Sequence, residues 1–175
     1  MRKGSRGFSL IELLIVVAII LIIAAIAIPN LLRSRIAANQ ASAVGSLRTL
    51  NTAEVTYATT YNTGYSSTLA DLGPGSPSAG IPNASFAGLV DEVLAGIGSP
   101  GGTATTTNVS SKSGYTFIYS PGTADNTGRI NVYYFQASPI TPGTTGTNYY
   151  YTDQSGVIRQ NSTAMATSTD SPLAG

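Results

Sequence analysis

Three residues near the N-terminus, Gly7, Phe8 and Glu12, have the types and spacing that can do chemistry. Gly7 is a small residue that precedes a long apolar run, whereas a secretory signal places its small-residue cleavage site after that run. Cleavage after Gly7 would leave the apolar segment in the mature protein, with Phe8 as its new N-terminus. Glu12 is a lone carboxylate at the edge of the segment, where ionised side chains are costly and usually functional. The alternatives are a flexible joint at Gly7 and a position of Glu12 at the level of the lipid headgroups.

A basic leader and an apolar helix position these residues. The leader contains Arg2, Lys3 and Arg6, and no charged side chain occurs from Leu13 to Leu32. At about 1.5 Å per residue, a helix of that length crosses a hydrocarbon core of about 30 Å. Basic side chains before an apolar helix favour a cytoplasmic N-terminus, so the C-terminal part is expected across the membrane.

The N-terminus resembles the class III signal of type IV prepilins and pseudopilins, and RGFSLIELLIVVAII together with Pro29 carries the resemblance. The resemblance implies that a prepilin peptidase cuts after Gly7, that Phe8 becomes N-methylated and that Glu12 is required for assembly. It also implies that the new α-amine of Phe8 on an adjacent subunit pairs with Glu12 in a filament. Family members often carry a glycine in mid-helix where this chain has Leu21, so any loosening of the helix is expected at Pro29.

Composition excludes several kinds of site. The chain has 175 residues and contains neither cysteine nor histidine, so disulfides, thiolate metal sites and histidine-dependent catalysis are impossible. Loss of the leader leaves six basic and eight acidic side chains, a balance of −2, and we expect no nucleic-acid site. Asp153 and Asp170 lie among oxygens that suit calcium, but they form no recognisable ligand string. We therefore predict no catalytic residue, no cofactor and no metal.

The hydrophobic periodicity predicts one long helix from about Phe8 to Tyr61. After a cleaved leader of residues 1–7, the segment 8–35 is apolar all round, and residues 36–62 form an amphipathic continuation. Proline lacks a backbone donor, so we predict a kink at Pro29. The dry face of the continuation is expected to contain Ile36, Ala43, Val44, Leu47, Leu50, Val55, Tyr57 and Tyr61.

The head, residues 36–175, is expected to complete an α+β fold, with an antiparallel β-meander of about four strands packed on the amphipathic part of the helix. Between helix and sheet, the αβ-loop of residues 63–114 is predicted to contain a short helix at SFAGLVDEVLAGIG and an exposed connection over 101–114. Adjacent tyrosines in the strands must point to opposite faces, and we assign them to packing. The polar tail, residues 161–175, is expected to be loose. The strands are predicted within residues 115–160 from their period of two, at 115–120, 130–137, 148–152 and 156–160.

The resemblance and these elements together predict a structural subunit of a type IV pilus. The precursor would lie in the bacterial inner membrane and be processed by the prepilin peptidase and methyltransferase. The inner-membrane assembly machinery would then polymerise it into an extracellular helical homopolymer. One alternative is a pseudopilin in a periplasmic pseudopilus of type II secretion, which calcium-dependent stability of the head would favour. The other is a membrane-anchored periplasmic binding module, which would tolerate Glu12→Ala.

Overall fold

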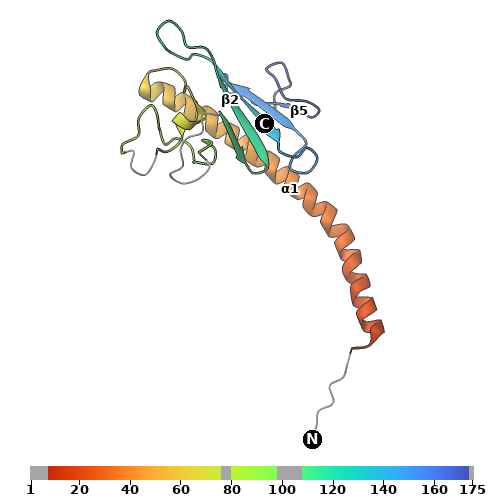
Figure 1. The fold of residues 1–175 in the computed structure, drawn as a ribbon. Coiled ribbons are helices and arrows are strands. Elements are labelled where there is room, and N and C mark those ends of the chain that lie inside the picture. The colour runs from red at the N-terminus through yellow and green to blue at the C-terminus, as the bar shows by residue number, and fades with distance from the viewer. Residues whose placement is uncertain (1–7, 76–79, 98–107, 174–175) are drawn as a thin grey trace. The chain divides into compact units, whose positions relative to one another are not determined.

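The computed structural model describes residues 8–75, 80–97 and 108–173, and the chain divides into two compact units, residues 1–35 and 36–175. The expected α+β fold, a long helix followed by an antiparallel sheet, is confirmed (Figure 1). The described elements are α1 (Leu10–Tyr61), the 3-10 helix η1 (Leu69–Leu72), β1 (Val109–Lys112), β2 (Tyr115–Pro121), β3 (Tyr133–Pro139), β4 (Tyr149–Asp153) and β5 (Arg159–Asn161).

In the first unit, α1 begins at Leu10, two residues after the expected start at Phe8. Ser9 takes the N-cap position, because its carbonyl oxygen accepts the first helical bond from the N–H of Leu13, at 3.2 Å. The helix continues through Pro29. The kink expected there stays a prediction.

In the second unit, α1 buries one face in the core of the head. Leu47 and Leu50 are fully buried there, in a cluster that also contains Phe117 and Phe135 from the sheet. Val55 was expected on this face, and that expectation is wrong, because its side chain is 53% exposed. The buried neighbour is Glu54, which lies four residues after Leu50 and therefore continues the same face of the helix.

The end of α1 was predicted at Tyr61 and is confirmed. Asn62 follows in the left-handed conformation, with φ of 55°, and Gly64 has φ of 83°. Asparagine and glycine are the residues that enter this conformation most easily, so a right-handed helix ends where they occur.

The sheet is an antiparallel meander in the order β1-β2-β3-β4-β5. It has one strand more than expected, since β1 lies where we predicted an exposed connection. β1 and β2 are joined at Ser113 and Gly114, whose φ values of 49° and 75° suit a tight hairpin turn. Ser110 in β1 is buried opposite Phe117, so a hydroxyl residue occupies a core position that a hydrophobic pattern does not reveal.

Tyrosines alternate between the two faces of the sheet, as predicted. Tyr133 is 2% exposed whereas its neighbour Tyr134 is 38% exposed, and Tyr150 is buried between two half-buried tyrosines in β4. The buried ring of Tyr133 makes an edge contact with Phe135, with centroids 5.5 Å apart. Packing therefore accounts for the inward tyrosines.

The short helix predicted at SFAGLVDEVLAGIG is wrong, because the described residues 85–97 form turns and irregular backbone. Gly88 and Gly96 have φ of 64° and 75°, and a right-handed helix cannot continue through such residues. The segment instead lies against η1, where the N–H of Ala87 donates to the carbonyl of Asp71 at 2.7 Å. Most of the apolar residues that suggested a helix are nevertheless partly or fully buried, among them Val90, Leu94 and Ile97, whereas Val93 is exposed.

The C-terminal segment covers the outer edge of β5, so the expectation of a loose tail is wrong for its described part. The N–H of Gln160 donates to the carbonyl of Ser171 at 3.0 Å, and the N–H of Leu173 donates to the carbonyl of Ile158 at 2.7 Å. Ala166 is fully buried, and its carbonyl accepts a bond from the side chain of Gln136. Backbone pairing and one small buried side chain thus hold a segment whose composition is polar.

Candidate functional site

The first candidate site is the N-terminus of α1, where the structure places Phe8, Ser9 and Glu12. Phe8 precedes the helix and is 83% exposed. The N–H of Ser9 donates to Oε2 of Glu12 at 2.9 Å, so Glu12 closes the first turn of the helix. A carboxylate at this position also interacts favourably with the positive end of the helix dipole. Gly7, the residue predicted to precede the cleaved bond, lies outside the described residues.

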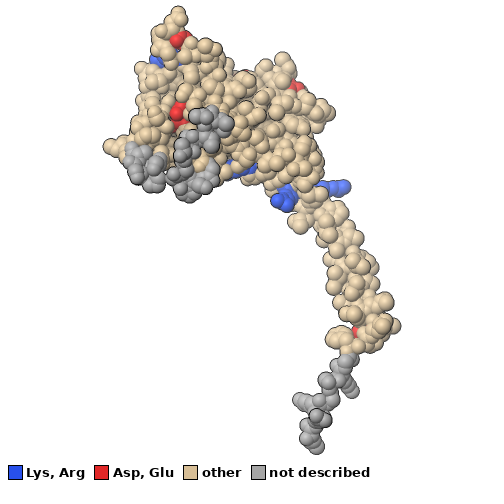
Figure 2. Space-filling model, viewed as in Figure 1, with Lys and Arg blue, Asp and Glu red and all other residues tan. Residues whose placement is uncertain are grey.

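The apolar surface of α1 that follows Glu12 has no cover within the described chain. Leu10 is 80% exposed, Ile20 57% and Leu31 70%, although each side chain is fully hydrophobic. α1 contains a window with a mean hydropathy of 3.3, none of it buried, which is long and apolar enough to cross a membrane. Figure 2 shows this part of the helix as a surface nearly free of charged side chains.

The head does not need this surface for its own core. The core cluster lies between Ala43 and Ile158 and draws on α1, the αβ-loop and the sheet. Burial of apolar area stabilises folded proteins by about 25 cal/mol per Å². A helix that leaves every large side chain from Leu10 to Leu32 exposed therefore forgoes that stabilisation until another molecule or a bilayer covers it.

A second polar centre, which was not predicted from the sequence, lies inside the head. Glu54 is fully buried, its Oε2 accepts the N–H of Ser66 at 2.9 Å and its Oε1 accepts the Ser66 hydroxyl at 2.6 Å. The Tyr119 hydroxyl donates to the carbonyl of Ser66 at 2.7 Å. Together these bonds fasten the start of the αβ-loop to α1 and to β2. The spacing of Glu54 from Leu47, Leu50 and Tyr57 places it on the same face of the helix. That spacing is the sequence signal that could have revealed its burial.

Burial dominates the electrostatics of this centre. It raises the pKa of Glu54 above 4.5, although the bonds from Ser66 act in the opposite direction. Burial also raises the pKa of Tyr119, and the nearby Glu54 carboxylate adds to the rise. Both effects follow from the cost of placing a negative charge in a low-dielectric interior. The centre is therefore suited to holding a loop in place. The Ser66 hydroxyl donates to a carboxylate, but both side chains are fully buried and are closed to a substrate.

The described residues offer no cluster that could hold a metal ion. No group of three or more acidic side chains comes together among them. Asp153 and Asp170, the residues weighed for calcium, are engaged in local bonds: Asp153 accepts the N–H of Ser155, and Asp170 accepts the N–H of Thr167 and the side chain of Asn161. Asp153 thus acts within its own turn, and Asp170 links its turn to β5.

A groove of about 510 Å³ runs beside α1 in the head. Arg48 is the charged residue of its lining, which otherwise consists of Asn51, Thr52, Val55, Thr56 and Gly156. The Arg48 guanidinium could attract an anion to this groove. The lining has no pair of side chains that could act as general acid and general base, which hydrolytic chemistry requires. The groove thus presents no catalytic constellation.

Comparison with known proteins gives the N-terminal segment its context. Residues 2–28 match the family model described as the prokaryotic N-terminal methylation motif. The chain is 51% identical over 53 residues to the type IV major pilin protein PilA of Myxococcus xanthus, and 62% identical over 37 residues to the type IV wide pilus major component PilA4 of Thermus thermophilus. No solved structure matches the chain.

Each of these two similarities covers less than a third of the chain. The first covers 30% of this chain and 24% of the relative, and the second covers 21% and 28%. The chain thus spans about a quarter of the length of the curated relatives it matches. The resemblance to the N-terminal signal of type IV pilins is confirmed, and the fold of the head rests on its own structure.

Proposed function

We propose that this chain is a structural subunit of a type IV pilus, which polymerises through the apolar part of α1. The processing steps follow from the motif: cleavage after Gly7, N-methylation of Phe8 and an assembly role for Glu12. The proposed partners are other copies of the chain, a prepilin peptidase with methyltransferase activity and the inner-membrane assembly machinery. The precursor is proposed to lie in the bacterial inner membrane, and the assembled protein in a filament at the cell surface.

One observation carries the proposal. The apolar surface of residues 10–32 is uncovered in a chain whose head already has a separate core. Such a surface is stable in lipid or against identical surfaces, because both environments remove it from water. A membrane stage followed by a filament stage therefore needs one sequence with one continuous apolar helix, which α1 supplies.

The proposal is tested with filaments sheared from the surface of cells that produce the full chain or its Glu12→Ala variant. Electron microscopy should show long filaments from the wild type and few or none from the variant. Mass spectrometry of the same material should find a subunit that begins at an N-methylated Phe8. A subunit that still begins at Met1 would refute the processing step.

The same experiment separates the pseudopilin alternative. A pseudopilin predicts a processed chain that stays in the membrane and periplasm, without surface filaments. The anchored binding module predicts an unassembled chain whose location and amount are the same with Glu12 and with alanine at that position.

A further inference from the structure

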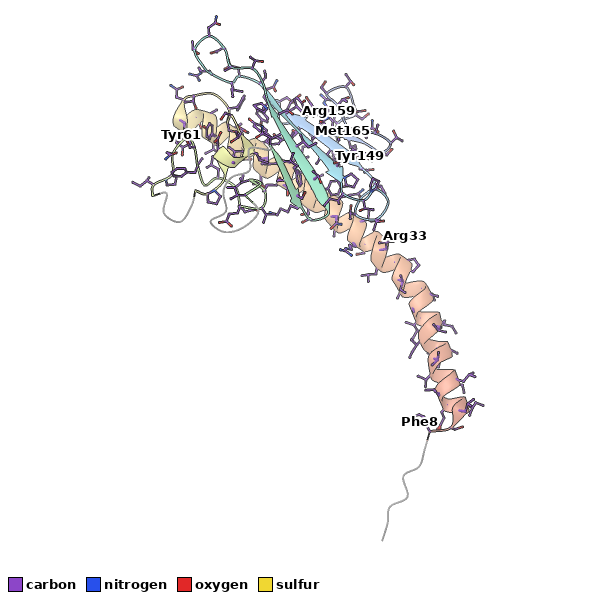
Figure 3. The ribbon with its side chains drawn as sticks, viewed as in Figure 1. Phe8, Arg33, Tyr61, Tyr149, Arg159 and Met165 are labelled. Atoms are coloured by element: carbon purple, nitrogen blue, oxygen red, sulfur yellow. The ribbon has the colours of Figure 1, made fainter. Side chains whose placement is uncertain are left out.

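The charges of the first unit have an unusual distribution. Its described part contains one acidic residue, Glu12, and two basic residues, Arg33 and Arg35, with no charge between Leu13 and Leu32. At about 1.5 Å per residue, the 21-residue interval from Glu12 to Arg33 is about 32 Å along the helix. Figure 3 labels Phe8 at the start of this helix and Arg33 beyond the apolar stretch.

None of these charges has an ionic partner among the described residues of its own chain. The ion pair found among the described residues joins Lys112 and Asp91 in the head. Glu12 uses Oε2 for the N–H of Ser9, and no bond to its Oε1 is found in the described part of the chain. An interval of about 32 Å also prevents Glu12 and Arg33 of the same straight helix from meeting.

Packing of identical helices in the same direction restricts where Glu12 can lie. A carboxylate buried among apolar side chains without a partner is strongly destabilising. At a stagger of 1 to 20 residues toward the neighbour's C-terminus, Glu12 of one copy lies level with an uncharged residue of its neighbour. These residues are Leu, Ile, Val and Ala, with Pro29 and Asn30 near the end of the interval. Without stagger, two Glu12 carboxylates lie at one level and repel. The first stagger that brings a guanidinium level with Glu12 is 21 residues, at Arg33.

We propose that Glu12 of one copy forms an ion pair with Arg33 of a neighbouring copy displaced by 21 residues along α1. The inference rests on the proposed function and adds a register to it. Guanidinium and carboxylate form the strongest and most directional ion pairs, which suits a contact that must fix one stagger among many similar ones. At a stagger of four residues in the opposite direction, Glu12 lies level with the α-amine of Phe8 on another copy. The ion pair with Arg33 is therefore a second contact of the same carboxylate, made with a different neighbour.

Arg35 provides an internal control. Residues two positions apart on an α-helix are separated by about 200° around its axis, so Arg33 and Arg35 point to opposite sides of α1. A neighbour that reaches Arg33 therefore does not reach Arg35 from the same side. Lipid headgroups surround an isolated helix on all sides and would use both residues alike.

The first test is a charge exchange in the full chain, read out as the amount of sheared surface filament relative to total protein. Glu12→Arg and Arg33→Glu should each lower filament yield by about tenfold or more, as expected for at least one lost ion pair in a cooperative polymer. The double variant, with both charges exchanged, should recover most of the yield. Glu12→Arg combined with Arg35→Glu should not.

The second test measures the register and leaves both charges intact. The chain has no cysteine, so Val16→Cys with Ala37→Cys introduces two thiols at the same 21-residue interval. A bis-maleimide matched to the interhelical distance of about 8–10 Å should link copies in intact filaments into a ladder. The matched control, Val16→Cys with Asn30→Cys, has a 14-residue interval and should give no ladder of cross-linked copies.

Recovery in the charge exchange together with a ladder from the 21-residue pair would establish the contact. The proposal is overturned by filaments of the Val16, Ala37 variant that give no ladder, by wild-type filament yield from Arg33→Glu, or by recovery with Arg35→Glu. The cross-linking result decides alone where Glu12→Arg prevents membrane insertion. Absence of filaments from the wild type would refute the proposed function itself, which is a different outcome.

Discussion

Replacing Glu54 by glutamine should stabilise the head at neutral pH. Glu54 is fully buried, its polar contacts come from Ser66, and the charge that acts on it from nearby is that of Asp71, which is also acidic. Burial raises its pKa above 4.5, so the ionised form is the unfavourable one in the folded head. Glutamine keeps the size of the side chain and an oxygen for the N–H of Ser66, while the negative charge is removed.

The sign and size of the effect follow from proton linkage. Because the pKa of Glu54 is higher in the folded than in the unfolded chain, folding takes up a proton between the two values. The free energy of unfolding is therefore highest below the unfolded value and falls as pH rises through the raised pKa. One proton gives a slope of at most about 1.4 kcal/mol per pH unit. Glu54→Gln should lack this slope.

Other carboxylates act in a different pH range. The pKa values of Asp125 and Asp170 are lowered from 3.8 by hydrogen bonds from nearby backbone and side-chain donors. Their contribution is present above the unfolded value and is lost as pH falls through the lowered one. The interval above 4.5 therefore reports on Glu54, and the difference between wild type and Glu54→Gln isolates it.

Urea denaturation of the full chain in detergent, followed by near-ultraviolet circular dichroism from about pH 4 to about pH 8, measures the effect. The signal reports on the head because every tyrosine lies at residue 57 or later and the chain has no tryptophan. Glu54→Ala is the matched variant, and it should lose about 1–3 kcal/mol at every pH because the N–H of Ser66 loses its acceptor. Parallel pH curves for wild type and Glu54→Gln would refute the reasoning.

Two further predictions concern packing, and the same denaturation assay measures both. Gly146→Ala should destabilise the head by about 1–3 kcal/mol, because an added Cβ would overlap the ring and hydroxyl of Tyr115. Its control, Gly45→Ala, should stabilise by about 0.5–1 kcal/mol, since the position is helical and an added Cβ would meet nothing within 4 Å. Equal effects of the two alanines would contradict this account. Leu47→Ala should cost about 2–5 kcal/mol because Leu47 is fully buried, whereas Val55→Ala should change stability little because Val55 is exposed. A large loss from Val55→Ala would show that residue to be packed.

The parts of the fold with strong periodicity were predictable. The long helix ended at Tyr61 as expected, because the amphipathic pattern stops there and Asn62 and Gly64 favour left-handed backbone. The strands β2, β3 and β4 were found because alternating tyrosines and apolar residues fit a sheet with one buried face. Local pattern and tertiary packing agree in these segments.

The misses share a physical cause, since tertiary contacts decided what local pattern left open. The segment around Gly88 had helical spacing, but its backbone bonds to η1 instead. β1 is a strand whose buried residue is Ser110, and the C-terminal segment is held by backbone pairing with β5. Glu54 was missed because a carboxylate on a helix is ordinarily solvated, and its burial depends on Ser66, twelve residues away.

At the candidate N-terminal site, the sequence indicated processing and assembly, whereas the structure of a single chain shows no contacts between copies. The motif around Phe8 and Glu12 was recognisable because it combines a basic leader, a small residue and a lone carboxylate before an apolar run. The structure adds the bond from Ser9 to Glu12 and the exposure of the helix. Contacts between copies depend on a second molecule, so they remain predictions.

The C-terminal segment that pairs with β5 has a consequence for crowding. An uncovered strand edge offers a row of free N–H and C=O groups to any other strand, which is how sheets fuse and aggregate. Here the bonds of Gln160 to Ser171 and of Leu173 to Ile158 occupy that row. Heads packed close together would thus contact one another at this edge through side chains, and would not add strands to each other's sheets. A chain that ends before Ser171 should expose the edge of β5 and aggregate more readily than the full chain.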